Sequence, residues 1–125
     1  MSMIKYGKTQ EVKHERYKYV TIEEYKCAYK DKTITVPINF LTDGFTGGFD
    51  YGHAWVVHDY LYATHTFDDN SECTREQADE IMTNIMHEEH MGWREKLFRF
   101  VTKHNLFWIF SKAWELSFAR GPEFM

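Results

Sequence analysis

The stretch Ala54–Tyr62, with the sequence AWVVHDYLY, constrains the fold of this chain more than any other feature. It is apolar at both ends, which indicates a buried element, yet His58 and Asp59 stand side by side in its middle. On a helix, His58 and Tyr62 lie one turn apart on one face, while Asp59 points about 100° further round. Removing an ionisable pair from water is costly unless the pair gains partners. The pair is therefore either satisfied by partners in the core or it binds something. From this stretch alone the two interpretations are equally good.

Length and charge bound the remaining possibilities. With 125 residues, the chain is long enough to bury a hydrophobic core and too short for two domains. We therefore expect a single domain over residues 1–125. The formal net charge of −4 and the lack of a long basic run argue against a general nucleic-acid binder. Cys27 and Cys73 are too few for a disulfide framework, and nothing requires them to pair.

No targeting or membrane-spanning segment is expected. Residues 1–10 are polar and lack the apolar centre of a signal peptide. No apolar run approaches the roughly 20 residues that span a bilayer. These features predict a chain that is made and kept in a reducing cytoplasm.

The first part of the chain, residues 1–38, is predicted to be rich in β-structure. Aromatic and β-branched residues alternate with lysines, which is typical of a small antiparallel sheet with one face in water. The predicted strands and breaks are Tyr17–Thr21, Tyr25–Lys30, a turn at Asp31–Lys32, Thr33–Val36, and an end or sheet edge at Pro37.

A glycine-rich loop over residues 39–50 connects this sheet to the helices. Thr42–Asp50 contains three glycines, two carboxylates and two threonines. Such a loop can turn its carbonyl groups inward and offer the hard oxygen ligands that calcium prefers, with Asp43 and Gly44 as candidates. The alternative is an ordinary crossover from sheet to helix, which is the better interpretation of this stretch taken alone.

Residues 51–120 are predicted to form three or four helices, the first over Tyr51–Ala63. Thr74 opens the second, and Gln77 completes a capping-box pattern. The second helix has a buried stripe that recurs at the helical period: Ala78, Ile81, Met82, Ile85 and Met86.

The later helices are expected over Trp93–Lys103 and Leu106–Phe118, separated from the second helix by Gly92 and ended by Gly121–Pro122. The last helix is dense in aromatic residues and reads as a lid over the core. We therefore predict that its large side chains pack mainly inward, namely Trp108, Phe110 and Trp114. An exposed part of it could instead touch a membrane or a partner.

Polar side chains of the first two predicted helices are expected to lie close together. Asp79 lies at the margin of the second helix's apolar stripe and needs a donor, and His58 is the natural candidate. We predict a hydrogen bond between them across two antiparallel helices. A histidine held in this way can act as a general base, since the carboxylate fixes its tautomer and stabilises the imidazolium. Asp59 would be left to hold a cation that polarises a carbonyl, and Tyr62 can orient Asp79.

Three sequence blocks in this order resemble a known family: Phe40-x-Thr42-Asp43, His58-Asp59-x-Leu61-Tyr62 and Arg75-x-x-Ala78-Asp79. The family consists of proteins of unknown function that are common in phages and prophages. The resemblance covers roughly residues 34–110. It implies phage origin and a place in the host cytoplasm or in the virion, without an established activity.

The core of the same pattern, H-D-x-x-Y followed by A-D on the next helix, is similar to phospholipase A2, especially its short viral forms. The resemblance implies a central helix pair of that type within an α+β fold. It further implies that His58 activates water, Asp59 binds Ca²⁺, Asp79 holds the histidine and Tyr62 supplies a supporting hydroxyl. The Y-G-x-G-type calcium loop is absent at its usual position, and Thr42–Gly48 is only a loose substitute. The disulfide partners beside the histidine are absent too.

Two classes of function follow. The first is a metal-assisted hydrolase acting on a lipid or another acylated ester, with His58 as the base. A phosphohydrolase of the H-D type is weaker, because it needs further ligands such as His53 or His65. The second class is a non-enzymatic phage accessory or virion protein that binds a host protein. In that case the His-Asp cluster is a buried structural contact that holds two helices together, which we call a polar staple.

Overall fold

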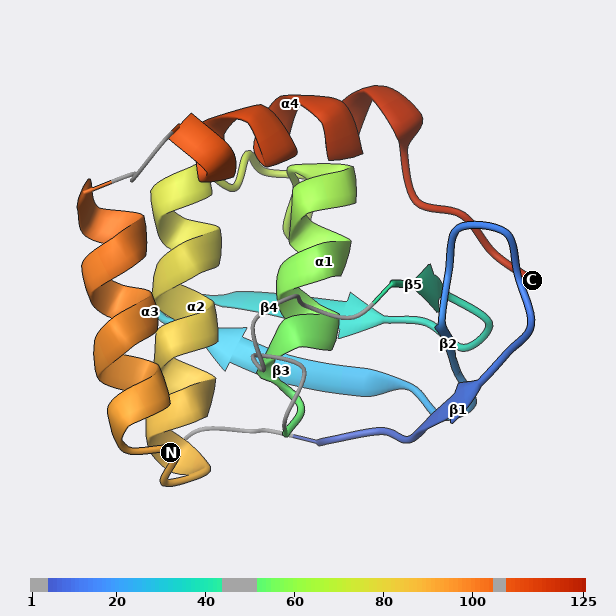
Figure 1. Cartoon of the computed structure of the whole chain (residues 1–125), viewed down its shortest axis with the longest axis horizontal. Coiled ribbons are helices and arrows are strands. Elements are labelled where there is room, and N and C mark those ends of the chain that lie inside the picture. Colours follow the sequence, from blue (N-terminus) through green and yellow to red (C-terminus); the bar gives the residue numbers. More distant parts are fainter. Residues whose placement is uncertain (1–4, 44–51, 105–107) are drawn as a thin grey trace.

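The computed structural model describes residues 5–43, 52–104 and 108–125. Within these ranges, short antiparallel strands in the first third of the chain are followed by four helices (Figure 1). This is an α+β arrangement, so the predicted fold class is confirmed. None of the helices in these ranges is long and apolar enough to cross a membrane.

The strands form two small sheets. β1 (Thr9–Glu11), β2 (Tyr19–Thr21) and β5 (Leu41–Thr42) make a three-stranded antiparallel sheet in the order β1-β2-β5. β3 (Tyr25–Tyr29) and β4 (Lys32–Val36) form a separate antiparallel hairpin. Two of these strands, β1 and β5, were not predicted. One is polar throughout and the other has only two residues, so neither carries the alternation that identifies a strand.

The β3–β4 hairpin has the expected division between its faces. Tyr25, Cys27 and Tyr29 are buried, whereas Lys26 is exposed. Its turn, however, lies one residue earlier than predicted. Tyr29 pairs with Lys32, which leaves Lys30–Asp31 as the turn, with Lys30 in the left-handed region at φ 55°. β4 ends immediately before Pro37, as the missing amide donor of proline requires.

The helices are α1 (Ala54–Thr64), α2 (Arg75–Glu88), α3 (Trp93–His104) and α4 (Ile109–Arg120). α1, α2 and α3 stand next to one another with successive antiparallel directions, and α4 crosses over their ends (Figure 1). α1 is covered by α2, α4 and β4. It is consequently apolar and buried around most of its circumference, with buried residues Ala54, Trp55, Val56, Val57, His58, Leu61, Tyr62 and Ala63.

Local signals explain where α2 begins and how it is oriented. The Gln77 amide donates to Thr74 Oγ1 over 3.2 Å, and the Thr74 amide donates to Gln77 Oε1 over 2.9 Å, so the predicted capping box is formed. The five apolar residues of the predicted stripe are all buried. This orientation turns Asp79, at the margin of the stripe, toward α1.

The prediction for the last helix was wrong at Trp108. That side chain is 77% exposed, and it lies at the residue before α4 with φ 57°. Phe110 is buried and Trp114 is partly buried, with its ring edge-on to Tyr62 at a centroid distance of 4.9 Å. Phe110 and Trp114 are one helical turn apart and share a face. Trp108 precedes the helix and does not belong to that face.

Candidate functional site

His58 and Asp79 are brought together by the α1–α2 contact. His58 Nε2 lies 2.7 Å from Asp79 Oδ1, so the predicted hydrogen bond between antiparallel helices is confirmed. The two side chains are almost completely buried, with residue exposures of 2% and 4%. With Nε2–H donating to the carboxylate, a neutral His58 carries its lone pair on Nδ1. Asp79 thus sets the tautomer of the imidazole.

Asp79 has two further donors. The Tyr62 hydroxyl donates to Oδ1 over 2.6 Å, and Arg75 Nη1 donates to Oδ2 over 3.1 Å. Burial and the Asp79 carboxylate raise the pKa of Tyr62, which keeps its hydroxyl protonated as a donor. We call these four residues the α1–α2 cluster: His58, Tyr62, Arg75 and Asp79.

Arg75 is the member of this cluster whose role was not predicted. It was noted only as part of the R-x-x-A-D block, although its spacing from Asp79 is the i, i+4 spacing of a helical ion pair. That spacing was the available signal. Because Asp79 receives three donors, its burial is compensated without any bound ligand.

His58 is enclosed by aromatic rings. The Tyr62 ring lies 4.1 Å from the imidazole between centroids, and Phe98 of α3 meets it edge-on at 5.5 Å. A cavity of about 300 Å³ between α2 and α3 is lined by Arg75 and Asp79, but His58 is not among its lining residues. Of the His58–Asp79 pair, only Asp79 borders this cavity.

Asp59 points to a different part of the molecule. The Thr42 hydroxyl at the end of β5 donates to Asp59 Oδ2. Burial, followed by the nearby Asp43 carboxylate, raises the pKa of Asp59 well above its usual range. We call these three residues the α1–β5 cluster: Thr42, Asp43 and Asp59. They line a small cavity of about 60 Å³ beside Arg120 and Glu123.

The α1–β5 cluster offers the types of ligand that a divalent cation prefers. Two carboxylates and a hydroxyl are hard oxygen donors. The pKa of Asp59 is raised first by burial and then by repulsion from Asp43, and a cation between the two carboxylates would relieve that repulsion. Within the described ranges, however, no group of three or more His, Cys, Asp or Glu side chains is placed to hold a metal. Gly44, the third predicted ligand, and the rest of the loop through residue 51 lie outside the described residues.

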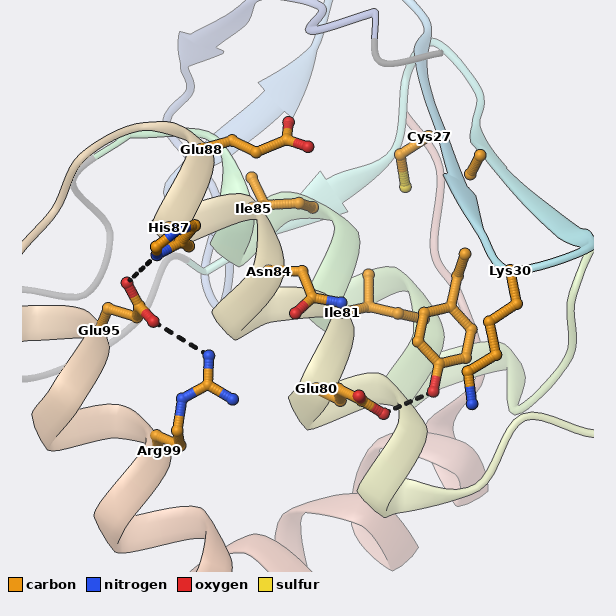
Figure 2. Close-up of a pocket in the computed structure, with 12 residues that line it drawn as sticks. Cys27, Lys30, Glu80, Ile81, Asn84, Ile85, His87, Glu88, Glu95 and Arg99 are labelled. Carbon is orange, nitrogen blue, oxygen red and sulfur yellow. Dashed lines mark hydrogen bonds and ion pairs between the residues drawn. The ribbon is translucent and has the colours of Figure 1, made fainter. Parts of the chain in front are cut away.

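A cavity larger than these two lies elsewhere. It has a volume of about 630 Å³ and opens between β3, α2 and α3 (Figure 2). On its α3 side, Glu95 accepts from Arg99 and contacts His87 Nδ1, both over 3.0 Å. His87 is thus engaged by α3. The predicted site residues do not line this cavity. Its side chains come from three separate elements, β3, α2 and α3, so no single local spacing in the sequence indicates it.

The two cysteines are free thiols, and both are buried. Burial raises the pKa of Cys27 and of Cys73 to about 12. Neither thiol is a nucleophile at neutral pH, since the thiolate is the reactive form.

Comparison with known proteins locates the chain within a family. No curated protein and no solved structure gives a significant match. Residues 19–102 match the family described as "Protein of unknown function (DUF1353)", and this segment includes all three sequence blocks and both polar clusters. Since the match spans more than half of the 125 residues, the chain belongs to the DUF1353 family.

Proposed function

We propose that this protein is a hydrolase of lipid or other acyl esters, with His58 as general base and the α1–β5 cluster holding a divalent cation such as Ca²⁺. The observation that carries the proposal is that the adjacent residues His58 and Asp59 have different partners. The imidazole is held through Nε2 by Asp79, and the adjacent aspartate faces a second carboxylate.

The α1–α2 cluster supplies what a general base needs. Asp79 orients the imidazole and stabilises the positive charge that forms when Nδ1 takes a proton from water. Tyr62 fixes the carboxylate from one side and Arg75 from the other. In this role Tyr62, Arg75 and Asp79 are positioning residues, and His58 is the residue that acts on the reacting atoms.

The α1–β5 cluster supplies an anionic oxygen site. Asp59 and Asp43 would bind the cation, and Thr42 orients Asp59 through its hydroxyl. When bound, a divalent cation supplies Lewis-acid polarisation of the ester carbonyl. The similarity of the H-D-x-x-Y and A-D pattern to phospholipase A2 supports an ester of lipid type as the substrate.

A second function is favoured by the burial of His58. Its residue exposure is 2%, and Phe98 lies against its ring. Asp79 is also fully compensated by protein donors. Both observations suit a polar staple between α1 and α2. In this alternative the protein is a non-enzymatic accessory or virion protein of phage origin that binds a host protein, acting in the host cytoplasm or in the virion.

Metal binding separates the two functions. Melting temperatures would be measured at neutral pH with and without Ca²⁺ for the wild type, Asp59→Asn and Asp43→Asn. If the protein is a calcium-dependent hydrolase, Ca²⁺ at a hundred times its dissociation constant should stabilise the wild type by about 2.7 kcal/mol. Asp59→Asn should abolish this shift and raise the melting temperature without calcium, because it removes a repelled carboxylate.

Asp31→Asn is the matched control, since Asp31 is an exposed carboxylate in the β3–β4 turn. It should keep the full calcium shift. If Ca²⁺, Mg²⁺ and Zn²⁺ all leave the melting temperature of the wild type unchanged, the metal site is wrong. That result would favour the alternative in which the cluster is a polar staple.

A further inference from the structure

α3 has two apolar faces, and the fold uses only one of them. Its inner face carries Phe98, which is fully buried in the core. Its opposite face carries Trp93, Leu97 and Phe100, which are 61%, 43% and 54% exposed. Spacings of four and three residues align these three side chains along one side of a helix. We call them the outer stripe of α3.

The outer stripe requires an explanation because it does not serve the core. Isolated apolar residues are common on protein surfaces, but aligned groups of large ones mark interaction sites. Leu97 and Phe98 are adjacent apolar residues of α3, yet only Phe98 is buried. Neighbouring residues on a helix point about 100° apart, so the helix cannot bury both in the same direction.

The charge of α3 differs from that of the rest of the molecule. The helix contains four basic residues and one acidic residue, which gives it a net charge of +3. The whole chain has a net charge of −4, so the residues outside α3 carry −7. Lys96, Arg99 and Lys103 are exposed beside the stripe, and the Arg94 guanidinium lies over the Trp93 ring at 4.6 Å.

We propose that the outer stripe of α3 docks onto an anionic lipid surface. A helix face with Trp, Leu and Phe flanked by Lys and Arg matches the chemistry of a bilayer interface, where apolar side chains enter the headgroup region and cations pair with lipid charge. A second copy of this chain fits less well. A symmetric contact would bring two α3 helices of charge +3 together.

This inference rests on the proposed function for its purpose, since it brings the protein to a surface of lipid esters. The docking itself does not require His58, which lies on the opposite, buried side of Phe98. His58→Asn should therefore bind vesicles as the wild type does, whether or not it has lost activity. Failure of docking and failure of catalysis are thereby distinguishable.

The test is flotation of the full chain with vesicles of phosphatidylglycerol and phosphatidylcholine, compared with vesicles of phosphatidylcholine alone. Each basic side chain near an anionic surface contributes roughly five-fold to partitioning. We expect strong binding to the mixed vesicles, little to the neutral ones, and loss in about 0.5 M salt. Lys96→Gln with Lys103→Gln should weaken binding by roughly 25-fold.

The apolar half of the proposal is tested by the double variant Leu97→Ser with Phe100→Ser, expected to weaken binding about ten-fold or more. Ile38→Ser is the matched control, because Ile38 is 53% exposed outside α3 and its loss should leave binding unchanged. Circular dichroism confirms folding of each variant. Equal binding to both vesicle types, or none at low salt, would overturn the proposal. So would a dimer that the double variant dissociates in the absence of vesicle binding.

Discussion

The α1–α2 pair and the α3–α4 pair place their side chains in opposite ways. Between α1 and α2, ionisable groups are buried, and His58 and Asp79 bond directly to each other. On α3 and α4, large apolar groups face solvent, including Leu97 of α3 and Leu116 of α4. A buried polar group must be matched by the protein, whereas an exposed apolar group costs the fold little. The first pair should therefore control stability and chemistry, and the second pair the surface that the protein presents to partners.

The largest effect is expected at Asp79. Asp79→Ala leaves His58, Tyr62 and Arg75 without their common acceptor in a buried position. Breaking a buried pair in this way typically costs about 3–5 kcal/mol. Urea denaturation would measure the loss, with Asp31→Ala as the exposed control. A loss below about 1 kcal/mol would show that the cluster does not hold α1 and α2 together.

Adjacent residues on α3 provide a sharper comparison. Phe98→Ala removes a fully buried ring and should cost about 3–5 kcal/mol. Leu97→Ala removes an exposed side chain and should change stability by no more than about 0.5 kcal/mol. Comparable losses from the two substitutions would mean that the outer stripe is covered within the protein, and the lipid proposal would fail with it.

Tyr62→Phe tests a single contact within the α1–α2 cluster. The substitution keeps the ring that contacts the His58 imidazole and removes the hydroxyl that donates to Asp79. Loss of one hydrogen bond to a buried carboxylate should cost about 1.5–3 kcal/mol. Thermal denaturation of the variant beside the wild type measures this cost. An unchanged melting temperature would indicate that His58 and Arg75 suffice to stabilise the carboxylate.

A smaller effect concerns the buried thiols at alkaline pH. The folded pKa of Cys27 and of Cys73 is about 12, against an ordinary value of 9.0. Between these values the unfolded state loses protons that the folded state retains, so stability falls as pH rises. The expected loss is about 1 kcal/mol per thiol from pH 9 to pH 10. Denaturant titrations at both pH values, with Cys27→Ala, would show whether one thiol's share of this dependence disappears.

Local signals in the sequence predicted much of the helical part. Thr74 and Gln77 indicated the start of α2 because their side chains form a capping box, and Gly121 indicated the end of α4. The pairing of His58 with Asp79 was also predictable, because His58 lies within an apolar stretch and Asp79 lies at the margin of the apolar stripe of α2. These inferences needed no knowledge of the tertiary arrangement beyond two helices in contact.

Features that depend on long-range packing were not predictable in the same way. β5 exists because Leu41–Thr42 pairs with β2, and two residues alone carry no periodicity. The exposure of Trp108 follows from its place before α4, which a count of aromatic residues does not reveal. The approach of Asp43 to Asp59 depends on where β5 meets α1, and the sequence supplied only the residue types.

The most direct test of the central claim is fatty-acid release from vesicles of phosphatidylglycerol and phosphatidylcholine in the presence of Ca²⁺. The wild type would be measured beside His58→Asn, whose side chain has a similar volume but cannot accept a proton. We expect calcium-dependent release by the wild type and a loss of about 10²–10⁴-fold in the variant, provided that the variant remains folded. Release by neither protein, or equal release by both, would contradict the assignment of His58 as a general base.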